Sequence, residues 1–128
     1  MKLLLDTHIF IWWADQPEKL SQAILSALED ETNVLMLSVA SIWEMQIKVQ
    51  WGKLKLSLPL KELIASQQET NGFQLLPVEL AHVLALDALP FHHKDLFDRL
   101  LVAQSIEEDA TFVSVDSKLS AYPVKLLQ

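Results

Sequence analysis

Four carboxylates stand where the sequence could build a metal-dependent site: Asp6, Glu44, Asp98 and Asp116. Apolar residues surround the first two, so these side chains are expected to be half-buried and close to one another. Like charges about 4 Å apart repel by roughly 4 kcal/mol at an effective dielectric near 20. Such a cluster must take up protons, pair with basic groups or bind a hard cation.

The chemistry of this cluster depends on what neutralises it. Oxygen-only ligands favour Mg²⁺, with Mn²⁺ as a second choice, over zinc, which prefers nitrogen and sulfur. Such an ion polarises a phosphodiester and activates an attacking water. Lys48 and Arg99 are the basic residues that could neutralise the cluster instead. Each aspartate taken singly is better explained as a helix cap, and only the group of four favours a metal.

Composition limits the classes of protein to which the chain can belong. A length of 128 residues fits one domain, expected to span residues 1–128. The net charge of −7 argues against a broad basic surface for nucleic acid. The absence of cysteine excludes disulfides and thiolate metal sites. No apolar run reaches the roughly 18 residues of a membrane span, and Asp6 interrupts the first run too early for a signal peptide. A cytoplasmic location without a membrane partner is therefore expected.

Short apolar runs alternate with helical patterns along the chain. The runs that predict strands are residues 3–5, 34–37, 74–76, 111–115 and 124–127. Helices are predicted around residues 20–28, 38–51, 59–71, 80–84 and 95–109. This alternation predicts an α/β protein of three layers, with a central parallel sheet of four to five short strands flanked by helices. Ligands bind such a sheet beyond the carboxyl ends of its strands, where Asp6 and Asp116 are expected to lie.

Five stretches, in this order, resemble the VapC-like branch of the PIN-domain family. They are Leu4–His8, Ser38–Glu44, Trp51–Leu54, His92–Leu101 and Ser114–Asp116. The likeness covers essentially the whole chain, and the ordered set with this spacing is specific although each stretch alone is short. Two positions depart from the family pattern: Leu96 replaces the usual proline, and Ser114 replaces the more usual threonine but keeps its hydroxyl.

The resemblance implies a PIN-like fold and a Mg²⁺-dependent endoribonuclease that acts as the toxin of a toxin–antitoxin pair. The family's acidic quartet, expected to bind the metal and to be catalytic, falls on Asp6, Glu44, Asp98 and Asp116. Ser114 matches a supporting hydroxyl, and Thr7 and Arg99 lie in the matching stretches and are expected to support the site. The implied partners are an RNA substrate, a second copy in a homodimer, and a cognate VapB-like antitoxin whose C-terminal segment fills the active-site groove.

Basic residues near the quartet could contact RNA. Lys48 lies one helical turn beyond Glu44 and is the best candidate, with Lys53 and His93 as weaker ones. A solvated helix end and loop explains the lysines equally well. The histidines lack the i, i+4 spacing of a helical zinc site, so packing or hydrogen bonding is the favoured role for them.

Two further predictions concern structural roles. Asp95 is expected to cap the last long helix, and it could also orient Arg99. Three tryptophans are expected to lie in the core or at a subunit interface rather than to stack on bases: Trp12, Trp13 and Trp43.

Two alternative functions stay open on the sequence alone. One is another metal-dependent nuclease that acts on DNA, since these residues do not separate DNA from RNA. The other is a catalytically inactive PIN-like module that binds a protein partner, against which the intact acidic quartet argues. A phosphatase is disfavoured, because a chain with only two glycines carries no Gly-rich phosphate loop.

Overall fold

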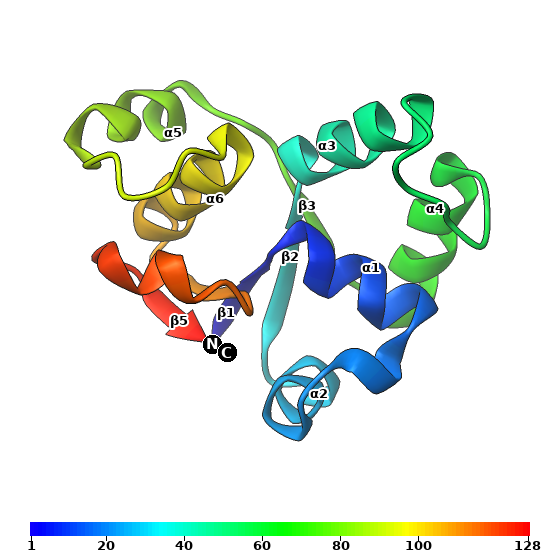
Figure 1. Ribbon diagram of the computed structural model, residues 1–128. Coiled ribbons are helices and arrows are strands. Elements are labelled where there is room, and N and C mark those ends of the chain that lie inside the picture. The colour runs from blue at the N-terminus through cyan, green and yellow to red at the C-terminus, as the bar shows by residue number, and fades with distance from the viewer.

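The computed structural model describes all 128 residues, and its five strands form one parallel sheet (Figure 1). They are β1 (Lys2–Leu5), β2 (Val34–Ser38), β3 (Gln74–Leu76), β4 (Thr111–Val113) and β5 (Lys125–Leu127). Their order across the sheet is β3-β2-β1-β4-β5, and every neighbouring pair is parallel. All five predicted strands are present. The fourth ends at Val113 rather than at residue 115, because Ser114 and Val115 lead into the turn that carries Asp116.

Six α-helices connect the strands. They are α1 (Thr7–Asp15), α2 (Gln22–Glu29), α3 (Val39–Gln50), α4 (Leu60–Asn71), α5 (Leu80–Ala85) and α6 (Leu96–Glu107). Short 3-10 turns lie at η1 (Pro17–Lys19), η2 (Leu86–Ala88) and η3 (Ser117–Ala121). The Ser38 hydroxyl caps α3 by accepting the Ala40 amide, and Gly72 ends α4 with a φ of 66°, a left-handed conformation that favours glycine.

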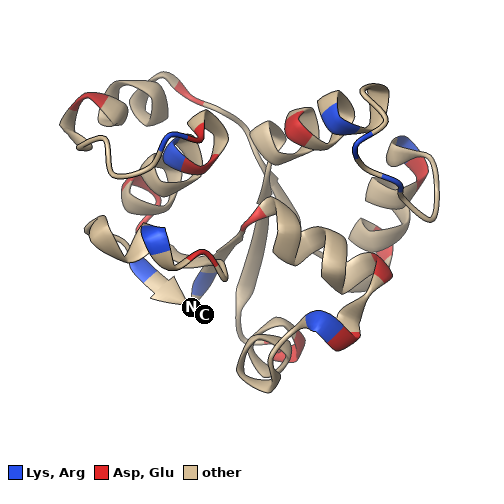
Figure 2. Cartoon of the chain, in the orientation of Figure 1, with Lys and Arg blue, Asp and Glu red and all other residues tan.

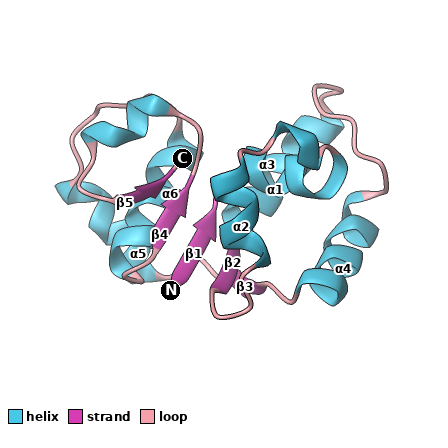
Figure 3. Cartoon of the chain, turned by 90° about the horizontal axis from the view of Figure 1, so that it is seen from below, coloured by secondary structure: helices cyan, strands magenta, loops and turns pink.

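Alternating side chains of the central strand divide the apolar core into two parts. Leu3 and Leu5 of β1 belong to a cluster with residues of α1, α2, α3 and α4. Leu4 points to the other face and packs with residues of α6 and η3, among them Leu101 and Leu119. All three leucines are fully buried, as a parallel strand covered on both faces requires. Figure 3 shows the strands side by side with α5 and α6 to one side and α1 to α4 to the other.

The strand order reverses between β1 and β4. From β1 the chain moves outward through β2 and β3, and it then returns to place β4 on the other side of β1. The backbone amide of Asp6 donates to the Val113 carbonyl at 2.9 Å, which fixes the two strand ends side by side. A ligand site is expected at this point of the sheet. No helix is both long enough and apolar enough to cross a bilayer.

Candidate metal site

Each of the four predicted acidic residues lies at the carboxyl-end edge of the sheet. Asp6 follows β1 and caps α1, and Asp116 follows β4 and caps η3. Glu44 is a buried residue of α3, and Asp98 stands in the first turn of α6. Figure 2 shows acidic positions after β1, on α3 and at the start of α6 bordering the middle of the molecule. An aspartate of this site can thus cap a helix and also belong to the acidic cluster.

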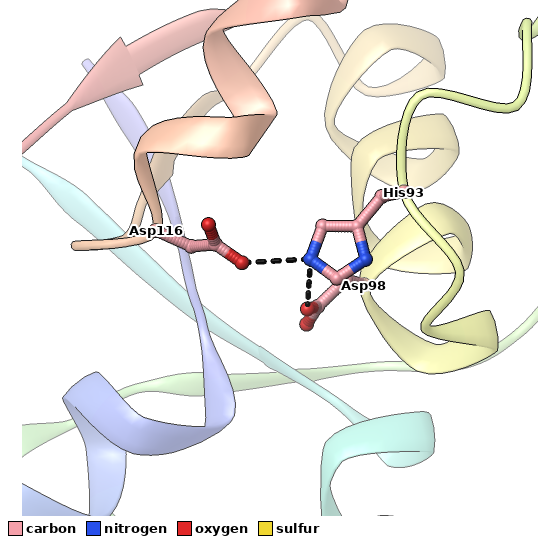
Figure 4. Close-up of side chains that lie close together, drawn as sticks. All are labelled: His93, Asp98 and Asp116. Atoms are coloured by element: carbon pink, nitrogen blue, oxygen red, sulfur yellow. Dashed lines mark hydrogen bonds and ion pairs between the residues drawn. The ribbon is translucent and has the colours of Figure 1, made fainter.

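Asp98 and Asp116 form a close group with His93 (Figure 4). One potential ligand atom from each of the three residues lies within 4.8 Å of the others. The His93 Nε2 atom is 2.7 Å from the Asp116 Oδ2 and 3.3 Å from the Asp98 Oδ2. Asp6 and Glu44 are not part of this group of three and are more deeply buried.

The charges of all four acidic residues nevertheless act on one another. Burial, together with the charges of Asp6, Asp95, Glu44 and Asp116, raises the pKa of Asp98 from 3.8 to about 8. Burial also raises the pKa of the Asp6 carboxyl, against the opposing effect of its hydrogen bonds. The site therefore holds more negative charge than its surroundings neutralise, which is the condition that a bound cation relieves.

Asp116 behaves in the opposite way. Burial alone opposes its ionisation, but the hydrogen bond from His93 and the backbone amide of Lys118 lower the pKa of this carboxyl below its usual value. Asp116 therefore stays ionised under conditions in which Asp98 holds a proton. Two neighbouring carboxylates with pKa values moved in opposite directions are typical of functional sites.

Two hydroxyls fix the buried acids in place. The Thr7 hydroxyl donates to the Glu44 Oε1 at 2.7 Å, and the Ser114 hydroxyl donates to the Asp6 Oδ2 at 2.7 Å. Both hydroxyls are buried, so each bond forms away from competing water. Thr7 and Ser114 thus each contact one acid of the quartet, and their supporting role in the activity stays a prediction. Serine in place of threonine keeps this bond.

Lys48 neutralises one side of the site. Its ammonium lies 2.7 Å from the Glu44 Oε2, one helical turn along α3. Burial opposes the charged form, but the hydrogen bond and charge of Glu44, with Asp95 and Asp98 further away, raise the pKa of Lys48. Lys53 lies over the ring of Trp51, 5.4 Å from its centroid. Contacts of these two lysines with RNA stay predictions.

A hard divalent cation fits this donor set. Every charged donor of the quartet is a carboxylate oxygen, and burial together with the charges of the neighbouring acids raises the pKa of Asp98. Carboxylate oxygens are the ligands that Mg²⁺ and Mn²⁺ prefer in proteins. The residues present are therefore suited to a divalent cation.

Comparison with known proteins assigns the fold family. The family model described as the PIN domain matches residues 3–125. The chain belongs to the PIN-domain family. It is 26% identical over 121 residues to Ribonuclease VapC22 of Mycobacterium tuberculosis, an alignment that covers 94% of this chain and 91% of the relative. This agrees with the VapC-like branch to which the sequence stretches pointed.

Solved structures of the same fold are similar over nearly the full length of this PIN domain. A chain of VapBC2 from Rickettsia felis, crystallised with a promoter DNA fragment, gives a TM-score of 0.74 at 17% identity, covering 99% of this chain and 98% of that one. A chain of VapBC-5 from M. tuberculosis gives 0.65 at 14% identity, covering 99% and 98%. A chain of FitAcB from Neisseria gonorrhoeae gives 0.65 at 18% identity, covering 98% and 96%. These likenesses establish the fold.

Arg99 corrects one expectation about this PIN domain. It is buried, its guanidinium donates to the Leu89 carbonyl at 3.0 Å, and it lies over the Phe91 ring at 4.1 Å. It forms no ion pair with the acidic quartet or with Asp95. Consecutive residues of a helix point in directions about 100° apart, so Arg99 and Asp98 face different neighbours. It holds the segment before α6 in place.

Trp43 was expected in the core or at a subunit interface, and the structure excludes the core. It is 62% exposed and so does not belong to the core; its ring packs edge-on against Phe97, with centroids 5.3 Å apart. Trp43 immediately precedes Glu44, and Phe97 immediately precedes Asp98. The contact between the two rings therefore joins α3 to α6 beside the site. Trp12 and Trp13 are partly buried against the larger core cluster. An interface role for any of the three stays a prediction.

Asp95 caps α6 as predicted. Its Oδ1 accepts the amides of Phe97 at 2.9 Å and of Asp98 at 3.1 Å. Leu96, which replaces the family's usual proline, is the first helical residue, where proline would only preset the backbone angle. The Asp95 cap fixes the helix start without it.

His93 is the site residue whose place the sequence did not reveal. Hydrogen bonding was the favoured role for the histidines, but the partners Asp98 and Asp116 could not be named. His93 lies close to Asp95 in the sequence. This closeness is the one signal that could have placed its ring near the start of α6. A direct contact of His93 with RNA stays a prediction.

Proposed function

We propose that this PIN-domain protein is a Mg²⁺-dependent endoribonuclease and the toxin of a VapBC-type toxin–antitoxin pair. The observation that carries the proposal is the group of four carboxylates at the switch point of the sheet, where burial and then the charges of the other acids raise the pKa of Asp98 to about 8. The similarity to a protein named Ribonuclease VapC22 supports RNA cleavage. The similarity to chains solved in VapBC complexes supports an antitoxin partner.

The acidic quartet holds the cation in this proposal. Asp98 and Asp116 would hold it together with Asp6 and Glu44, and the charges of the other three acids all act on Asp98. A bound Mg²⁺ or Mn²⁺ supplies a positive charge that polarises the phosphodiester and lowers the pKa of the attacking water. Metal ligation by each of the four acids, and their catalytic role, follow from the same proposal.

The remaining residues of the site orient these acids. The Thr7 hydroxyl donates to one oxygen of Glu44, and the Ser114 hydroxyl donates to one oxygen of Asp6. The second oxygen of Glu44 accepts from Lys48 and the second oxygen of Asp6 accepts the Thr7 amide, so both carboxylates are held in fixed orientations. Lys48 is partly exposed beside Glu44 and can bind a phosphate of the RNA that lies across α3. Lys53 and His93 are weaker candidates for RNA contacts.

We also propose that the chain forms one PIN domain over residues 1–128, that it acts in the cytoplasm and that it forms a homodimer. The family model that matches residues 3–125 supports the single domain. A cognate antitoxin is expected to cover the acidic site, because inhibition of a nuclease requires that RNA be kept from its metal. The homodimer rests on the exposed apolar face of α5, which includes Leu80 and Leu84.

Cleavage of purified cellular RNA by antitoxin-free protein tests the function. Discrete fragments are expected with Mg²⁺ or Mn²⁺, and none with a chelator or in the Asp6→Asn and Asp98→Asn variants, which should stay folded. Asp109→Asn is the matched control, because this exposed residue lies beyond the other end of α6, in an ion pair with Lys125, and should leave cleavage intact.

The same assay decides between the alternatives. Cleavage of DNA and not RNA would replace the ribonuclease with a DNA nuclease. Full activity of Asp98→Asn would remove the acidic quartet from the mechanism. A folded protein that neither cleaves nucleic acid nor binds Mg²⁺ in calorimetry would favour the inactive protein-binding module.

A further inference from the structure

The segment before α6 carries a histidine that the proposed metal chemistry does not require. The His93 side chain is only 12% exposed, and its ring stands between Asp98 and Asp116 (Figure 4). Its Nε2 atom is within hydrogen-bond reach of one oxygen of Asp116, at 2.7 Å, and within ion-pair distance of one oxygen of Asp98, at 3.3 Å. The ring therefore contacts two of the four carboxylates of the quartet.

The hydrogen bond at Nδ1 determines whether Nε2 can donate a hydrogen bond. The backbone amide of Asp95 donates to the His93 Nδ1 at 3.0 Å. A ring nitrogen that accepts an N–H bond carries a lone pair, so the ring proton is on Nε2. Nε2 is therefore a hydrogen-bond donor toward Asp98 and Asp116. It has no lone pair to offer a metal unless the ring proton moves to Nδ1, where it would oppose the Asp95 amide.

The backbone around His93 is anchored to both sides of the site. The Tyr122 hydroxyl accepts the amides of His92 at 3.1 Å and of His93 at 3.0 Å. Tyr122 directly follows η3, the turn that Asp116 caps, while Asp95 caps the helix that carries Asp98. The histidine is thus fixed to the two chain segments whose carboxylates it contacts.

We propose that His93 is a positioning residue, whose Nε2–H group holds the Asp98 and Asp116 carboxylates at the spacing that a shared cation requires, without binding the cation itself. The inference rests on the proposed metal function of the site. A carboxylate oxygen has two lone pairs, so it can accept this hydrogen bond and still bind a metal. Partners that orient ligands in this way commonly determine metal affinity.

Substitution of His93 by glutamine and by asparagine tests whether the ring acts as a hydrogen-bond donor at Nε2 or has only a structural role. The amide nitrogen of glutamine reaches about as far as Nε2, so His93→Gln keeps a donor near both carboxylates. The shorter His93→Asn reaches only about as far as Nδ1 and cannot bridge them. His92→Gln is the matched control, since the exposed His92 side chain contacts Tyr122 and neither carboxylate.

Binding of Mn²⁺ alone to the folded protein, measured by calorimetry and by electron paramagnetic resonance, is the first readout. His93→Asn should weaken binding by roughly 10- to 100-fold, as loss of ligand-orienting partners does elsewhere. His93→Gln and His92→Gln should bind like the wild type. Equal binding by all four proteins, or equal losses in His93→Gln and His93→Asn, would overturn the inference. So would a hyperfine coupling to a directly bound histidine nitrogen in the wild type.

Nitrogen NMR of the metal-free protein is the second readout, with His93→Gln identifying the signal. The inference expects the proton on Nε2 and a lone pair on Nδ1, and the opposite tautomer or a doubly protonated ring would overturn it. A wild-type protein that binds no Mn²⁺ would overturn the proposed function along with the inference. A wrong tautomer or a nitrogen ligand would overturn the inference alone.

Discussion

At the scale of single residues, crowding of negative charge is the property that organises this site. Asp98 experiences the charges of three other quartet members and of Asp95, whereas Lys48 pairs directly only with Glu44. The sequence could predict which acids converge, because Asp6 and Asp116 each follow a strand of one parallel sheet. It could not predict His93, since the ring reaches its partners only through the course of the backbone before α6.

Metal-free stability should fall with rising pH because of Asp98. The folded protein holds this proton up to about pH 8, whereas the unfolded chain releases it near 3.8. The free energy of unfolding therefore decreases progressively as pH rises through this interval, and Asp98 has no such effect below it. Thermal unfolding in chelator should show Asp98→Asn gaining stability over the wild type as pH rises.

Mg²⁺ provides the control for that prediction. Added cation should raise the unfolding temperature of the wild type most at the alkaline end of the interval, and should do little for Asp98→Asn. A constant stability difference between the two proteins at every pH would show that Asp98 does not titrate in this way.

At the scale of elements, the start of α6 is the piece that most directly places the site. Asp95 accepts two amides of the first turn, and Asp98 projects from the same turn. The sequence predicted this cap correctly because capping depends on local chain geometry. The direction of Arg99 and the exposure of Trp43 were not predicted, because they depend on which neighbouring elements pack against α6 and α3.

Asp95→Ala should cost about 1 kcal/mol in the free energy of unfolding, the usual effect of losing a helix cap. Cleavage should fall as well, because the first turn that carries Asp98 would fray. Asp95→Asn keeps a side-chain oxygen as acceptor and should lose less of both. Urea unfolding and initial cleavage rates measure the two effects. An alanine variant as stable as the asparagine variant would contradict the capping role.

At the scale of the whole molecule, the parallel sheet and its two-sided core could be predicted from the alternation of short apolar runs and helical patterns. The family match confirms the fold to which the ordered motifs pointed. Surfaces are harder to predict, because an apolar residue on a helix can face either the core or a partner. Leu80 and Leu84 of α5 are 72% and 63% exposed in the single chain, which leaves an apolar face uncovered.

The protein should therefore be a dimer at micromolar concentration, with α5 in the interface. Leu84→Glu should shift it toward monomer in analytical ultracentrifugation, because a charge would be buried without a partner. Leu58→Glu, which places the same charge on an exposed leucine outside α5, should leave the dimer intact. A wild-type monomer would refute the dimer, and a dimeric Leu84→Glu variant would place its interface elsewhere.

The bonds that hold Asp6 have a consequence for protein synthesis. Asp6 depends on the Val113 carbonyl and on the Ser114 hydroxyl, which lies 108 positions further along the chain. Because a ribosome releases its product from the N-terminus, Asp6 leaves the exit tunnel long before either partner exists. A nascent chain that stops before Asp116 therefore lacks part of the acidic quartet, and the proposed nuclease stays inactive until that residue has been added.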